Sequence, residues 1–201
     1  LAPYARMTNG QYIATAADLD NPELSQGARE GRARFEARFA DEALYGKVAY
    51  VNFGAKTTSL GAPASVDFVL NGRNIHNWMA AGTLDQVLAQ AFAVLKPGGV
   101  LAIEEHRNAE GTAQDPKAAS GYVTEAFVID AATRAGFTLA ARSEVLANPA
   151  DDRDHPFGVW TLPPNLRTSP AGQAPNPAFD SAPYAAIGES DRMALRFVKP
   201  E

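Results

Sequence analysis

The chain has 201 residues, 46% hydrophobic and 20% charged, so it is long enough to fold around a full hydrophobic core as one domain. Its net charge of −5 and pI of about 5.2 argue against a nucleic-acid partner, which a basic surface would indicate. It contains no cysteine, which excludes disulfides, thiolate metal sites and a cysteine nucleophile, and no apolar run is long enough to insert into a membrane.

The first sixty residues predict two short strands, at 11–16 and 47–51, on either side of a charged helix. This helix is expected at about 26–45, and its arginines are expected to face solvent. The chain opens with Leu1-Ala2-Pro3-Tyr4, which reads as the end of a helix, so we expect upstream residues, with any export signal among them. The compartment is open between cytoplasm and periplasm, because a lack of cysteine fits both.

The middle of the chain predicts a buried strand followed by an amphipathic helix. Residues 66–70 show no clean alternation, which is typical of a strand buried on both faces of a parallel sheet. Thr83 and Gln86 have the spacing of a capping box, and apolar residues then recur on one helix face. Residues 96–99, with the sequence KPGG, predict the end of this helix and a turn into a strand at 100–103.

The rest of the chain continues the alternation of strands and helices. A helix is predicted at 124–135, a strand at 137–141 and a last strand at 193–198. This order indicates an α/β fold with a mostly parallel sheet. Residues 148–191 are rich in Pro and Gly and too long for an ordinary connection, so they form either a lid or substrate wall, or a segment that wraps the surface.

Several motifs then resemble a known enzyme family. The order of a helix, the stretch 95–99 (LKPGG), an apolar strand and a helix ending in AGF at 135–137 resembles the C-terminal half of class I S-adenosylmethionine-dependent methyltransferases. The stretches RNIHNW (73–78), GVWTLPP (158–164) and GESDRM (188–193) look like a bacterial group of predicted methyltransferases. The resemblance covers almost the whole chain. It implies a doubly wound, mostly parallel, Rossmann-like sheet whose last strand is antiparallel.

The chain departs from this family in one respect. The family's glycine-rich loop, which follows its first strand and receives the cofactor, is not in these residues. The resemblance therefore implies an N-terminally truncated methyltransferase-like domain at 1–201 that lacks the first strand. The implied cofactor is S-adenosylmethionine and the implied partner is an unidentified small-molecule substrate. Whether these residues alone bind the cofactor and are active stays open. Whether the protein forms a homodimer also stays open.

The stretch FVLNGRNIHNWM at 68–79 places many polar side chains directly after a strand. In open α/β sheets, ligands bind beyond the carboxyl ends of the strands. Asn71 stands where many class I methyltransferases have a residue beside the transferred methyl group, so the resemblance implies both a catalytic and a cofactor-binding role for it. We expect Arg73, Trp78 and Trp160 to contact substrate. The alternatives are that Asn71 stabilises a turn and that Trp78 fills the core.

Four residues of the N-terminal part are expected to bind the cofactor. Asp18 and Asp20 end the first strand, where a carboxylate can accept both ribose hydroxyls. Helix capping is the alternative for this pair, and it fits Asp20 well. Asn52 and Phe53 follow the next strand and would flank the adenine if the resemblance holds.

The three histidines, His76, His106 and His155, follow strands or lie in the long segment. A histidine suits the removal of a proton from a hydroxyl or amine nucleophile. We expect His106, beside Glu104 and Glu105, to be a catalytic base or a substrate contact, and His76 to be the second choice. The alternative is that each histidine bonds a neighbouring loop. No metal is expected, because no close spacing supports a site made by the three histidines with Glu105.

Three functions follow from these expectations. The first is methyl transfer from S-adenosylmethionine to a small molecule. The second is a non-catalytic binding protein that keeps the fold but has lost cofactor binding. The third and weakest is a metal-dependent hydrolase that uses the histidines.

Overall fold

The computed structural model describes residues 1–201, which form two compact units, 1–62 and 63–201. The single methyltransferase-like domain expected from the sequence stays a prediction. None of the helices combines the length and the hydropathy of a membrane span.

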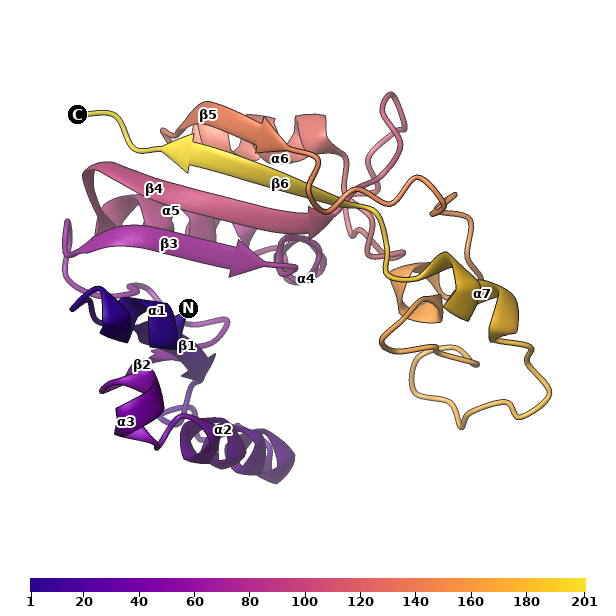
Figure 1. Cartoon of the computed structure of the whole chain (residues 1–201), viewed down its shortest axis with the longest axis horizontal. Coiled ribbons are helices and arrows are strands. Elements are labelled where there is room, and N and C mark those ends of the chain that lie inside the picture. Colours follow the sequence, from indigo (N-terminus) through magenta and orange to yellow (C-terminus); the bar gives the residue numbers. More distant parts are fainter. The chain divides into compact units, whose positions relative to one another are not determined.

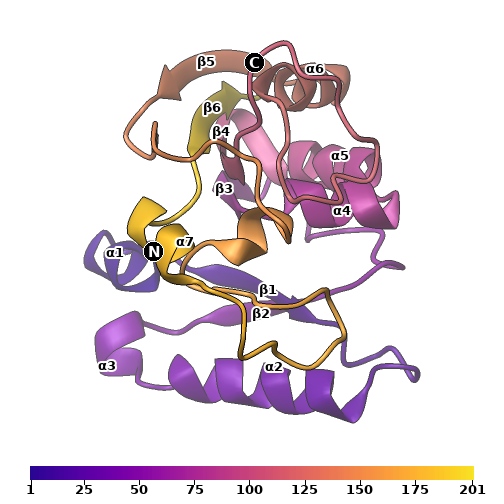
Figure 2. The ribbon, with the colours of Figure 1, turned by 90° about the vertical axis from the view of Figure 1, so that its right-hand side faces the viewer.

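The first unit is a pair of parallel strands with three helices. Its elements are α1 (Ala2–Met7), β1 (Ile13–Ala17), α2 (Gln26–Arg38), α3 (Glu42–Tyr45) and β2 (Ala49–Phe53). Figure 2 shows α2 running along one face of β1 and β2. The sequence predicted one helix over 26–45, but the chain breaks after α2, and Asp41 caps α3 by accepting the N–H groups of Ala43 and Leu44. Because a new helix begins at this cap after α2 has ended, the predicted helix is split in two.

The second unit contains a four-stranded sheet in the order β3-β4-β6-β5 (Figure 1). Its elements are β3 (Val66–Gly72), α4 (Ile75–Ala81), α5 (Leu84–Val94), β4 (Leu95–His106), α6 (Glu125–Arg134), β5 (Thr138–Ser143), the 3-10 helix η1 (Gly158–Thr161), α7 (Ala182–Ile187) and β6 (Arg192–Val198). Strands β3 and β4 are parallel, whereas β6 is antiparallel to both of its neighbours. The predicted α/β fold with an antiparallel last strand is confirmed.

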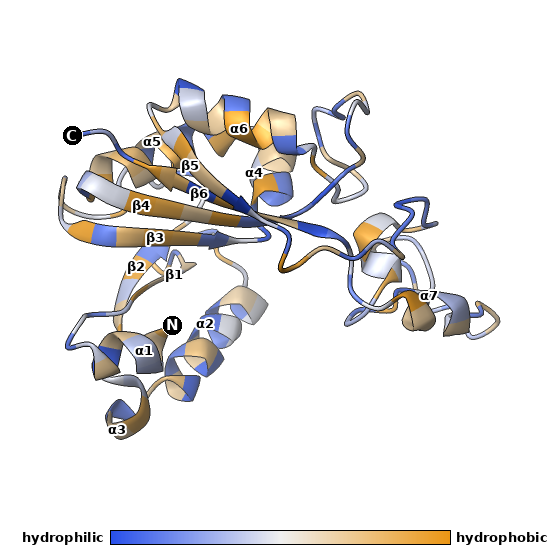
Figure 3. Ribbon diagram, turned by 45° about the horizontal axis from the view of Figure 1, so that its top comes forward, coloured by the Kyte–Doolittle hydropathy of each residue, from blue (hydrophilic) through white to orange (hydrophobic).

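The core of this unit lies between the sheet and helices α4, α5 and α6, which share one face of the sheet (Figures 1 and 2). Leu88 and Ala91 of α5 are buried in one cluster with Leu101 and Ile103 of β4. The strands are mainly hydrophobic along their length and become hydrophilic where β3 and β4 end (Figure 3). Apolar burial therefore holds the layers together, and polar groups gather at the strand ends.

Two predictions about strand burial and helix capping were wrong. Phe68 and Leu70 of β3 are 48% and 46% exposed, so β3 is not buried on both faces. It is an edge strand in this sheet, and the helices of its unit cover only the other face. Thr83 precedes α5 as expected, but its side chain makes no capping hydrogen bond.

The predicted turn at 96–99 was also wrong, because these residues lie inside β4. Gly98 has a φ of +73°, which favours glycine, and its N–H donates to the carbonyl of Lys199. The N–H of Lys199 donates in turn to the carbonyl of Gly99. Pairing with the chain end after β6 therefore continues the strand through a sequence that would otherwise turn.

The segment 148–191 is fixed to the sheet by the buried carboxylate of Asp191, whose side chain is 2% exposed. Arg107 donates to it through Nε and Nη2 at 2.9 and 3.0 Å, and Arg153 donates at 2.5 Å. The N–H of Asn148 adds a bond of 2.8 Å. Burial alone would raise the pKa of Asp191, but these donors outweigh it and hold the pKa below its ordinary value. Both ends of the segment thus meet at one charge.

A second buried carboxylate, Asp151, completes this anchor. It accepts hydrogen bonds from Tyr122 Oη at 2.9 Å and from the N–H of Asp191 at 2.7 Å, and Nε2 of His155 lies 2.8 Å away. Burial and the nearby Asp151 raise the pKa of Tyr122, so its hydroxyl keeps the proton that it donates. These contacts hold the ends of the segment; a lid or wall role for its middle stays a prediction.

We expect Asp191→Asn to lower the free energy of unfolding by about 3 kcal/mol, because the cations of Arg107 and Arg153 would stay partly buried without their anion. Urea denaturation at pH 7 measures this loss. The matched control is Glu144→Gln, which removes a 66% exposed partner of Arg107 and costs about 1 kcal/mol or less. Equal losses in the two variants would contradict the anchor.

The same comparison at low pH tests the charge. Because the pKa of Asp191 is lowered in the folded state, its stabilisation is present above the unfolded-state pKa of about 4 and is lost as the pH falls through the lower folded value. We therefore expect the difference between the parent and Asp191→Asn to shrink in strong acid. A difference that stays constant down to acid pH would exclude an ionised Asp191.

Candidate functional site

The site begins where β3 and β4 end side by side. Asn71 pairs with Ile103, and Gly72 pairs with Glu104, so both parallel strands reach the same edge of the sheet. Along β4, alternate residues point into the core, and this series ends with Glu105, whose side chain is 0% exposed. A carboxylate without contact to water needs compensating donors.

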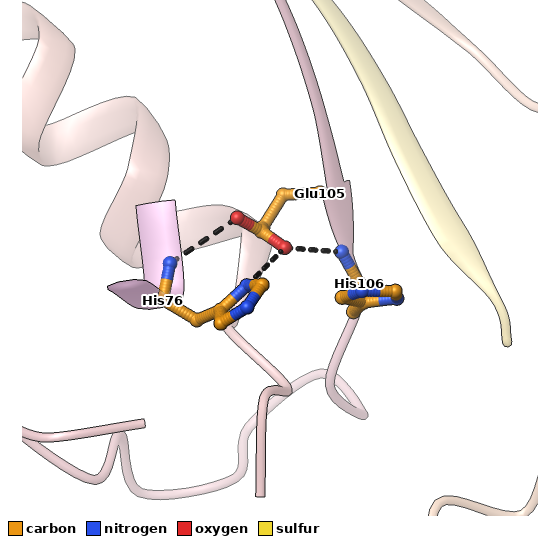
Figure 4. A group of neighbouring side chains, drawn as sticks. All are labelled: His76, Glu105 and His106. Carbon is orange, nitrogen blue, oxygen red and sulfur yellow. Dashed lines mark hydrogen bonds and ion pairs between the residues drawn. The ribbon is translucent and has the colours of Figure 1, made fainter. Parts of the chain in front are cut away.

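Three donors from two elements satisfy Glu105 (Figure 4). Oε1 lies 2.9 Å from Nδ1 of His76 and accepts the N–H of His106 at 2.9 Å. Oε2 accepts the N–H of His76 at 3.2 Å. Because His76 is the second residue of α4, the carboxylate ties the start of that helix to the end of β4. In the tautomer of His76 that carries its proton on Nδ1, this N–H donates to Glu105 and Nε2 keeps its lone pair.

The ring of His106 lies beside that of His76, with 5.4 Å between the ring centroids. Its Nδ1 is 2.5 Å from Oγ of the buried Ser190. Burial, with the nearby His76 and arginines, lowers the pKa of His106 to about 3. The imidazole is therefore neutral near pH 7 and holds a proton weakly. A role for His106 as a base stays a prediction, and a role as a hydrogen-bond acceptor or ligand suits its surroundings better.

Asn71 is the unusual residue of this edge. Its side chain is buried, with the residue 5% exposed, yet neither Oδ1 nor Nδ2 has a hydrogen-bond partner. A buried polar group without a partner costs about 1–3 kcal/mol. Such a group at the end of a strand marks a place where a polar ligand would complete the hydrogen bonds.

The three expected substrate contacts lie in different surroundings. Trp160, on η1, packs edge-on against His76 with ring centroids 5.8 Å apart, so the segment 148–191 reaches the histidines. Trp78 is partly buried against the hydrophobic core. Arg73 is largely exposed, with Nε 3.8 Å from Oε1 of Glu104. A substrate role for each of them stays a prediction.

The expected cofactor residues of the first unit gather where β1 and β2 end. Oδ2 of Asp20 accepts a bond of 2.8 Å from Nδ2 of Asn52, and Oδ1 of Asp18 accepts the N–H of Asp20 at 3.0 Å. Phe53 ends β2. Arg32 was expected to face solvent, but it is 7% exposed and donates to the carbonyl of Ala17 and to Oδ1 of Asn52. These bonds orient the strand ends; cofactor contact stays a prediction.

One residue of the site, Glu105, could have been recognised from the sequence as a buried, hydrogen-bonded carboxylate. The alternation Leu101, Ile103, Glu105 places Glu105 on the core side of β4, and a carboxylate in such a position has to be bonded. Ser190 gave no comparable signal, since it lies 84 residues from its partner His106.

Comparisons with known proteins address the fold. No family model matches the sequence, and no protein of curated function does. A methyltransferase from Methanosarcina mazei has a TM-score of 0.55 at 14% identity, over 98% of this chain and 86% of that protein. A TehB-like methyltransferase from Corynebacterium glutamicum has a TM-score of 0.51 at 12% identity, over 98% and 73%. Both are S-adenosylmethionine-dependent. This chain has the fold of a class I S-adenosylmethionine-dependent methyltransferase.

The methyltransferase fold does not by itself decide the reaction. The [4+2]-cyclase SpnF resembles the chain to a similar degree, with a TM-score of 0.53 at 14% identity over 98% of this chain and 70% of that protein. The function has to be argued from the side chains at the strand ends.

We expect Glu105→Ala to cost about 3 kcal/mol of folding free energy, because two N–H groups and one imidazole would lose a buried acceptor. Glu110→Ala, at an exposed glutamate of the loop after β4, serves as the control and costs about 0.5 kcal/mol or less. Urea denaturation of both variants measures the difference. A Glu105→Ala variant as stable as the control would show that the carboxylate does not organise this edge.

Proposed function

We propose that the protein transfers a methyl group from S-adenosylmethionine to a small-molecule acceptor. The observation that carries this proposal is the buried, unpartnered amide of Asn71 at the carboxyl end of β3, in a fold shared with enzymes that use this cofactor. The cofactor supplies an activated methyl group on a sulfonium centre. An amide side chain fits it, since one end donates and the other accepts hydrogen bonds from its polar groups.

For the residues of the first unit, cofactor binding is proposed from the family resemblance. Asp18 and Asp20 offer carboxylates for ribose hydroxyls, and Asn52 and Phe53 offer an amide and an aromatic ring for the adenine.

On the acceptor side we propose His76 and His106, with Trp160 and Arg73 as further contacts and Trp78 as the weakest of the group. Methyl transfer is an in-line displacement, in which positioning of the acceptor accounts for much of the rate. Glu105 and Ser190 hold the two imidazoles in place. Imidazoles held in this way can orient a hydroxyl or amine acceptor through hydrogen bonds.

The test is calorimetric titration of the full gene product with S-adenosylhomocysteine. We expect Asn71→Leu to weaken binding about 10- to 100-fold, because the ligand would lose hydrogen bonds to a buried amide. Its free energy of unfolding should not fall, since the amide has no partner in the protein to lose. Asn77→Ala, an exposed asparagine on α4, should leave the affinity unchanged.

Three outcomes separate the candidates. No binding by the parent protein overturns the proposal. Binding that Asn71→Leu does not change removes its supporting observation. Binding without turnover, when a broad set of small hydroxyl and amine compounds is offered with labelled S-adenosylmethionine, favours a non-catalytic binding protein of the same fold.

A further inference from the structure

We propose that His76, Glu105 and His106 bind one divalent transition-metal ion at the carboxyl end of β4. One ligand atom from each residue lies within 4.8 Å of the other two. The three side chains meet from two elements, the start of α4 and the end of β4 (Figure 4). The sequence predicted no metal here, because 29 residues separate the two contributing elements.

The donor chemistry favours a transition metal over magnesium or calcium. Two imidazole nitrogens and one carboxylate oxygen suit Zn²⁺ and its neighbours, whereas Mg²⁺ and Ca²⁺ prefer sets of oxygen ligands. Metal–ligand bonds of about 2.1 Å place tetrahedral ligands roughly 3 to 3.5 Å apart. Since the ligand atoms lie at most 4.8 Å apart, they would have to close by no more than roughly 1.5 Å to hold an ion.

Each of the three side chains keeps a lone pair for the ion. Oε2 of Glu105 accepts only one hydrogen bond, from the N–H of His76, and a carboxylate oxygen has two lone pairs. A proton on Nδ1 of each ring, donated by His76 to Glu105 and by His106 to Oγ of Ser190, leaves the lone pair of Nε2 for the ion. Hydrogen bonds on the other nitrogen orient metal-binding imidazoles in many proteins.

A purely structural role explains only part of this arrangement. The pair of Glu105 and His76 would tie α4 to β4 without a second imidazole. His106 makes no side-chain bond to Glu105, yet its ring is turned toward Ser190, 84 residues away, and lies beside His76. Two imidazole rings beside a buried carboxylate form a donor set that one divalent cation would complete. A bound metal would also lower the pKa of an acceptor hydroxyl that coordinates it. This activation of the acceptor rests on the proposed methyl transfer, whereas the metal site itself does not.

The experiment titrates the untagged, chelator-treated full gene product with Co²⁺ and Zn²⁺. We expect one equivalent per chain in calorimetry, and visible absorption bands of low-coordinate Co²⁺. Glu105→Gln and His106→Ala should each weaken the affinity at least about 10-fold, with folding checked by circular dichroism. If His76→Ala fails to fold, these two variants carry the test.

The third histidine provides the matched control. His155 belongs to a separate group with Asp151 and Asp152, which also brings ligand atoms within 4.8 Å. We expect His155→Gln to bind Co²⁺ like the parent. The proposal is overturned if the parent binds no metal, if Glu105→Gln and His106→Ala bind as tightly as the parent, or if only His155→Gln loses binding. Titration with S-adenosylhomocysteine in the absence of metal is a separate measurement, so either proposal can fail while the other stands.

Discussion

The edge of the second unit depends on one constraint, the charge of Glu105 at a position without contact to water. Strand alternation turns this side chain into the core, so its compensation has to come from the protein. The N–H of His106 is supplied by the strand itself, and the other two donors come from the start of α4. The polar stretch after β3 has this purpose: the chain turns sharply at Arg73, which has a φ of +54°, and brings His76 to the carboxylate.

The antiparallel direction of β6 brings a distant part of the sequence to the same edge. His106, at the end of β4, pairs with Arg192, at the start of β6. Ser190 and Asp191 directly precede β6 and therefore lie beside the histidines and Arg107. With Asp191 and Asp151 fixed, the segment 148–191 is held at both ends close to the sheet, and η1 brings Trp160 against His76. One strand direction thus sets what surrounds the imidazoles.

How much of this was predictable depends on the range of each interaction. The strands, α5 and α6 follow from local periodicity, and the antiparallel last strand follows from the resemblance. The strand pairing of Gly98 and Gly99 and the burial of Arg32 depend on distant partners and were predicted wrongly. The split of the helix at 26–45 was also predicted wrongly, although its cap at Asp41 is local. In the site, His76, His106 and Asn71 were recognised as chemical groups. Their contacts were not predicted, because the partners lie 29 or 84 residues away and the sequence does not show which distant residues come together.

The same fold serves methyltransferases and a cyclase, so the meaning of this edge lies in which groups are bonded and which are not. Asn71 is buried with no partner, whereas both oxygens of Glu105 accept hydrogen bonds. A buried amide without a partner costs free energy until a ligand binds it, whereas a carboxylate held by several donors forms a rigid support. The two lie at the ends of adjacent parallel strands. A ligand that bound the amide of Asn71 and extended to the end of β4 would meet imidazoles held by Glu105 and Ser190, which lowers the entropic cost of bringing reacting groups together.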